Sequence, residues 1–237
     1  MEKSPGSKRA VLEQSAKNSV GGRRNLKSGN VERFASLSKP SWMYDLAAAA
    51  YFTNESEAVI ENNILSPLRK LCEESGMNYW WASTDFPLHV TFLSATKQDE
   101  AGHKIYGPKT DSFYEPVKND PRINEQLRRL KDIQLTFKDV ILNGNNIILA
   151  ARDIPDTVTD FRKRVSTLEI EHGLSARPRY DILHITIARL REVQNDPVKR
   201  SEFIRRFTLL KRVIRQTPLV LTIGTPSLGR NFTKMPE

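Results

Sequence analysis

The sequence predicts an α+β fold in which one strand–helix–strand unit occurs twice. Two observations favour this class. Helix-like and strand-like segments are mixed along the chain, and two short segments are near copies, PLHVTF at 87–92 and ILHITI at 182–187. In each copy His and Thr lie two residues apart and aliphatic residues fill the alternate places, which is typical of a β-strand. The two units are expected at roughly 43–93 and 146–190.

The first forty residues are predicted to be a disordered basic arm. They are rich in Ser, Gly, Lys, Arg and Asn and show no sustained apolar period. Nine basic residues against three acidic ones give this arm +6 of the net charge of +9, so the body keeps only +3. The arm can contact nucleic acid, direct nuclear import or act as a solubilising tail, and its composition does not decide among these.

Residues 41–237 are expected to form a single domain. Apolar spacing and turn residues predict strands at 43–52, 78–95 with a break near Pro87, 133–142, 146–153, 177–190 and 218–229. Helices are expected at 56–76, 121–132, 156–173 and 196–213. A polar insertion at 95–119 is too long for an ordinary connection and is expected to be a mobile flap or a disordered segment.

The composition also indicates the compartment. The single cysteine, Cys72, has no partner for a disulfide, which favours an intracellular protein. No apolar run is long enough to span a bilayer, so a membrane is not an expected partner. We expect a cytoplasmic monomer, with a nuclear location as the alternative that the basic arm suggests.

The repeated pattern carries the chemistry. Residues two apart on a strand share a face, so His89 lies with Thr91, and His184 lies with Thr186. If the two halves pack about a pseudo-twofold axis, two imidazoles and two hydroxyls line one site. One neutral imidazole can then accept a proton while the other, protonated, donates one, and the hydroxyls can donate to phosphate oxygens.

Two plainer readings compete with this one. A single His on a half-buried strand is more often a structural residue than a catalyst, but two matching copies are improbable by chance. A metal site would need a further ligand, and neither strand offers one two residues from the motif on its Thr side. We therefore expect neither a metal nor a cofactor.

The two motifs resemble those of the 2H phosphoesterase superfamily. RPRYDILHITIAR at 177–189 is similar to the second motif of its RNA 2′,3′-cyclic phosphodiesterase (ligase-like) branch. LHVTFLS at 88–94 is similar to the first motif, with Ser94 where that branch often has Gly. The resemblance implies a bilobal fold, in which two pseudo-twofold-related lobes of antiparallel sheet with outer helices surround a central groove.

The resemblance also implies a phosphoric diester hydrolase with His89 and His184 as catalytic residues and Thr91 and Thr186 as phosphate ligands. The family's activities include opening of 2′,3′-cyclic phosphates, cleavage of 2′,5′-linked oligoadenylate and trimming of RNA 3′ ends. The long insertion and the Ser94 departure leave the substrate open.

Three further residues are weaker candidates. Tyr180 has the same parity as His184, and Trp81 precedes the first motif, so either ring can stack on a base. Arg189 can contact phosphate or pair with a carboxylate. Core or rim packing is the competing reading for both rings.

The sequence thus predicts a metal-independent phosphodiesterase that acts on RNA ends or short oligonucleotides. One alternative is an RNA-binding module without turnover. The other is a hydrolase of a small nucleotide cyclic phosphate, such as ADP-ribose cyclic phosphate, which the low charge of the body favours.

Overall fold

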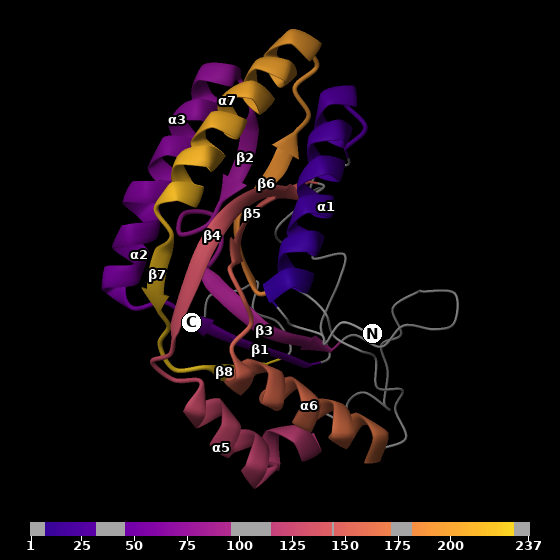
Figure 1. Cartoon of the computed structure of the whole chain (residues 1–237), viewed down its shortest axis with the longest axis vertical. Coiled ribbons are helices and arrows are strands. Elements are labelled where there is room, and N and C mark those ends of the chain that lie inside the picture. The colour runs from indigo at the N-terminus through magenta and orange to yellow at the C-terminus, as the bar shows by residue number, and fades with distance from the viewer. Residues whose placement is uncertain (1–7, 32–45, 96–114, 144, 172–181, 230–237) are drawn as a thin grey trace.

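The fold is α+β, as the sequence predicts: helices flank one eight-stranded antiparallel sheet (Figure 1). The structure, a computed structural model, describes residues 8–31, 46–95, 115–143, 145–171 and 182–229. The strands are β1 (Leu46–Tyr51), β2 (Asn78–Trp81), β3 (His89–Ala95), β4 (Gln134–Asn143), β5 (Asn146–Ala151), β6 (His184–Glu192), β7 (Leu219–Thr222) and β8 (Ser227–Gly229). The helices are α1 (Lys8–Ser28), α2 (Asn54–Ile60), α3 (Ser66–Ser75), α5 (Pro121–Arg129), α6 (Asp156–Glu171) and α7 (Pro197–Gln216).

Most elements of residues 41–237 lie where the sequence predicts them, with two differences. The helix expected at 56–76 consists of α2 and α3 joined by a π-helical turn, Glu61–Leu65, and α3 ends at Gly76, which has a left-handed conformation. The strand expected at 218–229 is two strands, β7 and β8, separated by residues 223–226. β7 pairs with β4 at one edge of the sheet, and β8 pairs with β1 at the other.

The sheet has two halves that meet at its centre. Its strand order is β7-β4-β5-β6-β3-β1-β8, with β2 also paired to β6. The halves join where β3 pairs with β6 at Val90 and Ile185. Helix α6 connects the two halves. It follows β5 in sequence, yet its Arg162 donates a hydrogen bond of 2.6 Å from Nε to the carbonyl of Phe92 in β3.

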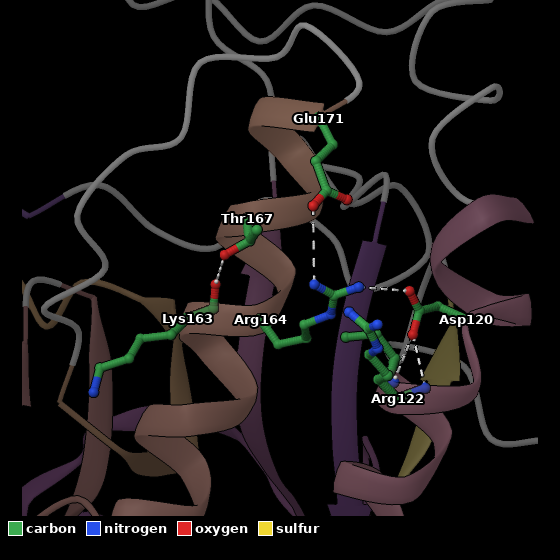
Figure 2. Close-up of polar contacts among 7 residues, drawn as sticks. Asp120, Arg122, Lys163, Arg164, Thr167 and Glu171 are labelled. Carbon is green, nitrogen blue, oxygen red and sulfur yellow. Dashed lines mark hydrogen bonds and ion pairs between the residues drawn. The ribbon is translucent and has the colours of Figure 1, made fainter.

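Helices α5 and α6 pack together at one end of the molecule (Figure 1). Asp120 caps α5 by accepting hydrogen bonds from the backbone N–H groups of Arg122 and Ile123. The same carboxylate pairs with Arg164 of α6 at 3.1 Å, and Arg164 also lies 4.0 Å from Glu171 (Figure 2). Arg164 thus connects the N-terminal cap of α5 to α6 and also contacts the last residue of α6.

The expectation of a disordered arm is wrong for residues 8–28, which form α1. This helix packs on β4 and α7, with Ser19 and Leu26 buried. The backbone of Gly22 lies so close to the Leu142 carbonyl that an added Cβ would be 1.9 Å from its oxygen. Among the described side chains of α1, the contact uses Leu26 together with the small or polar residues Ser19 and Gly22, which do not form a continuous apolar period. The rest of the arm lies outside the described residues.

Candidate active site

One row of core residues fixes the register of the five central strands. Ala50, Val90, Ile185, Leu149 and Val140 are successive partners across β1, β3, β6, β5 and β4. The five side chains are at most 3% exposed, so this row belongs to the hydrophobic core. Because side chains alternate along each strand, the residues next to this row point to the opposite face of the sheet.

The two copies of the motif lie on that opposite face. Because β3 and β6 run antiparallel, His89 comes beside Thr186, and Thr91 comes beside His184. The two histidines are diagonal neighbours, an arrangement that typically separates residues by about 7–8 Å. All four side chains are half-buried. The antiparallel pair has a local twofold symmetry, so this face, called the site face below, carries two equivalent His–Thr pairs.

Each histidine is held by the same local hydrogen bond. Nδ1 of His89 lies 2.9 Å from the carbonyl oxygen of Pro87, and Nδ1 of His184 lies 3.0 Å from that of Ile182. A carbonyl can only accept, so this bond assigns the ring proton to Nδ1 in both residues. Nε2 is then the nitrogen that can exchange a proton with a substrate.

Small residues flank the motif on the neighbouring strands. Ala49 of β1 is the partner of Thr91, and Ala150 of β5 is the partner of His184. Both alanines are fully buried, and a methyl group does not extend over a neighbouring imidazole or hydroxyl. Thr91 and His184 are therefore each flanked by a small side chain on the neighbouring strand.

Arg189 reaches the site face because β6 contains a bulge. Ile147 of β5 pairs with Ala188 and Ile148 pairs with Thr186, so Ile187 is the extra residue. The bulge reverses the alternation, and Arg189 shares the face of Thr186 although plain alternation would place it opposite. Its side chain is 5% exposed, and its guanidinium lies 4.7 Å from the ring centre of Phe86.

The surroundings of His89 disfavour its charged form. Burial lowers the pKa of His89, a hydrogen bond to the Pro87 carbonyl partly opposes this, and the positive charges of Arg189 and His184 lower the pKa further. His89 therefore stays neutral at pH values where an ordinary histidine begins to take up a proton.

Tyr51 belongs to the same face and was missed by the sequence analysis. It is the β1 partner of His89 and is half-buried, and burial raises the pKa of its hydroxyl, which keeps its proton at neutral pH. The sequence around it is a run of alanines, so only the register between β1 and β3 reveals that Tyr51 lies beside a histidine.

The expectation that Trp81 contacts a substrate is not supported, because Trp81 lies on the opposite face. It pairs with Ala188, and the bulge turns Ala188 away from Thr186. Its ring contacts Tyr79, with centres 6.0 Å apart, and Arg69 of α3 at 5.7 Å. Trp80 is the residue that shares the face of Arg189, its strand partner, and Tyr180 lies outside the described residues.

The arrangement can carry out proton transfer on both sides of an anionic group placed between the histidines. Within the described part of the chain, no three His, Cys, Asp or Glu side chains form a group that could hold a metal ion. None of the described helices is long and apolar enough to cross a membrane.

Comparison with known proteins gives distant structural likenesses. No protein-family model matches the chain, and no curated protein matches its sequence. One similar solved structure is described as a phosphoesterase, with 16% identity over 66% of this chain and 79% of that chain and a TM-score of 0.39. Another is Usb1 of Kluyveromyces marxianus, with 12% identity over 80% of this chain and 94% of that chain and a TM-score of 0.40.

Proposed function

We propose that the protein is a phosphodiesterase of the 2H type that cleaves a 2′,3′-cyclic phosphate or a phosphodiester at RNA ends or in short oligonucleotides. The observation that carries the proposal is the site face itself. Two His–Thr pairs occupy symmetric positions about one antiparallel strand pair, and both imidazoles are oriented by the same bond from Nδ1 to a backbone carbonyl. A purely structural role would not require this duplication.

The lowered pKa of His89 supports its assignment as the general base. For a cyclic phosphate, His89 Nε2 takes a proton from water as the water oxygen bonds to phosphorus. The bond from phosphorus to the 3′ oxygen breaks, and protonated His184 gives its Nε2 proton to that oxygen, which leaves a 2′-phosphate. For a linear diester, a ribose hydroxyl takes the place of water and the other nucleoside leaves.

The remaining groups on the site face are suited to the phosphate charge. The hydroxyls of Thr91 and Thr186 can donate to the two non-bridging oxygens, one from each side of the strand pair. Arg189 supplies a buried positive charge near His89, which attracts an anion and keeps the base neutral. The reaction proposed here passes through no metal.

The test is a panel assay with a chelator present. The substrates are a 2′,3′-cyclic mononucleotide, an RNA with a cyclic phosphate end, 2′,5′-oligoadenylate, linear RNA and ADP-ribose cyclic phosphate. His89→Ala and His184→Ala should each lower turnover about a hundredfold or more, and Thr91→Ala and Thr186→Ala should cost less. His103→Ala, outside both motifs, is the control. Mass analysis distinguishes a 2′-phosphate product from a 3′-phosphate.

Four outcomes would contradict parts of the proposal. Turnover that survives the double histidine substitution would exclude the two-histidine mechanism. Loss of turnover on chelation, with recovery when metal is added, would exclude the metal-free reaction. RNA binding without any product in the panel would identify a binding module, and turnover of ADP-ribose cyclic phosphate alone would identify a small-metabolite enzyme.

A further inference from the structure

Positive charge is concentrated in two helices, α1 and α7. Helix α1 has six basic residues and one acidic residue, a net charge of +5. Helix α7 has seven basic residues and one acidic residue, a net charge of +6. Together they carry +11, while the whole chain carries +9, so all other residues sum to −2. The net positive charge of the chain therefore resides in these two helices.

The fold brings these two helices together although they lie far apart in sequence. Ser19 of α1 accepts a hydrogen bond of 2.8 Å from Lys211 of α7, and the Lys27 carbonyl accepts one of 3.4 Å from Arg200. The contacts run in opposite directions along the two helices, so α1 and α7 are antiparallel neighbours. In Figure 1 they lie on either side of β4, α1 in indigo and α7 in yellow to orange.

The cations at this contact outnumber their partners. Asp139 of β4 pairs with Lys211 at 3.0 Å and with Arg215 at 2.7 Å, so one buried carboxylate faces two positive side chains. Burial lowers the pKa of Lys211, the charge of Asp139 raises it, and the charges of Arg215 and Arg23 lower it. Joining a helix of +5 to one of +6 is electrostatically unfavourable, so folding stability does not account for the charge.

Three of the exposed cations on α1 and α7 have no acidic partner among the described residues. Lys17 and Arg24 on α1 and Arg212 on α7 are exposed and form no ion pair with any described residue. Elsewhere on α7, Arg205 pairs with Glu202, and Arg206 pairs with Glu74 of α3. The three side chains are available to a polyanion without first breaking an ion pair.

The contact between α1 and α7 lies near the candidate active site, because Lys211 of α7 pairs with Asp139. Asp139 is the strand partner of Ala150, and Ala150 is the strand partner of His184, so all three lie on the site face. Two strand spacings of about 4.8 Å separate Asp139 from His184, roughly 10 Å in total. A nucleic-acid strand with one phosphate between the histidines can reach the two helices with its neighbouring nucleotides.

We infer that α1 and α7 together bind the sugar-phosphate backbone of single-stranded RNA whose end or scissile phosphate occupies the site face. The position of the RNA rests on the proposed function, but the binding itself does not need turnover. Among the described side chains, the exposed large apolar residues are Val20 on α1 and Val198, Leu209 and Val213 on α7. RNA is favoured over an anionic membrane because these few valines and one leucine do not form the broad apolar face of a membrane-surface helix.

The experiment compares two triple variants of equal charge change in the full-length chain. Lys17→Gln, Arg24→Gln and Arg212→Gln remove three exposed cations from α1 and α7, while Arg122→Gln, Arg128→Gln and Arg129→Gln remove three exposed cations from α5 at the other end of the molecule (Figure 1). Affinity for a single-stranded RNA of about 12 nucleotides is measured at several salt concentrations, together with hydrolysis of a 2′,3′-cyclic mononucleotide and binding to anionic lipid vesicles.

The α1–α7 variant should bind RNA about ten- to fiftyfold more weakly near physiological salt. The slope of log Kd plotted against log salt concentration should also fall by about 2, because each of the three lost phosphate contacts contributes about 0.7. The α5 variant should bind normally. Mononucleotide hydrolysis should be unchanged in both variants. Equal RNA affinity in the two variants, or vesicle binding that depends on these residues while RNA binding does not, would overturn the inference. Absence of mononucleotide hydrolysis with RNA binding intact would instead contradict only the proposed function.

Discussion

At the scale of single residues, the position of Arg189 depends on one extra residue in β6. Without the bulge at Ile187, the alternation from His184 would direct residue 189 into the opposite face of the sheet. With the bulge, the guanidinium packs on Phe86 and its charge acts on His89. The charge of Arg189 therefore affects the pKa of the proposed base, His89, and the pH dependence of the reaction can measure this effect.

Arg189→Gln should shift the acid limb of the pH–rate profile to higher pH. In the native protein the midpoint of kcat/KM on the acid side should lie below 6.5, because His89 must be neutral to act as a base and its pKa is lowered. Removing a neighbouring positive charge makes protonation easier, so the pKa of His89 and the midpoint rise. The plateau should fall about tenfold to a hundredfold, because the phosphate loses a countercharge.

Two further variants make this measurement specific. Arg189→Lys retains the charge and should keep the midpoint close to its native value. Arg191→Gln removes an arginine that stacks on Trp80 at 4.4 Å, and it should leave the profile unchanged. An acid limb that stays in place in Arg189→Gln, or that moves to lower pH, would show that Arg189 does not control the ionisation of the base.

At the scale of elements, α1 depends on the absence of a side chain at Gly22. The added Cβ would lie 1.9 Å from the Leu142 oxygen, a backbone atom of β4 that cannot move aside without disturbing the sheet. At the preceding residue, Gly21, an added Cβ meets nothing within 4 Å. These adjacent glycines on the same helix provide a matched pair of positions.

Gly22→Ala should displace α1 from the body, whereas Gly21→Ala should stabilise the helix by about 0.5–1 kcal/mol through its higher helix propensity. Amide hydrogen exchange of residues 8–28 and limited proteolysis measure the displacement. In Gly22→Ala exchange within α1 should be much faster, and RNA affinity should fall with it if α1 contributes to binding. Equal protection of α1 in the two variants would contradict the close contact.

At the scale of the whole molecule, each half of the sheet is stabilised by parts of the other. Arg162 of α6, which follows β5, bonds to the backbone of β3, and the C-terminal chain forms one strand at each outer edge. The two halves share the central pair of Val90 and Ile185. The buried apolar residues of both halves belong to one hydrophobic cluster, so we expect the body to unfold as one unit.

Unfolding in urea should therefore follow a single transition, with the same midpoint by tryptophan fluorescence and by far-ultraviolet circular dichroism. Arg162→Met removes the buried bond between the halves and should lower the free energy of unfolding by about 1–3 kcal/mol, with both signals shifting together. Lys163→Met, an exposed neighbour on α6, should change it little. Separate midpoints for the two signals would indicate that the halves unfold independently.

The motifs, their strand periodicity and most element positions could be read from the chain, because each depends on local alternation and turn residues. His89, Thr91, His184 and Thr186 were predicted to share a site on that basis, and the pairing of β3 with β6 brings them onto one face. The proposed class of reaction is inferred from the types of these residues.

Other features depended on contacts between distant segments. The positions of Arg189 and Trp81 follow from a bulge whose register is set by β5 and β2, and Tyr51 joins His89 only through pairing with β1. Helix α1 escaped prediction because, among its described side chains, the docking contacts of Gly22 and Ser19 are not apolar and Leu26 alone is a large buried apolar residue. Local pattern specifies which residues alternate, but a bulge or a docked helix is stabilised by its partner strands, and these lie elsewhere in the chain.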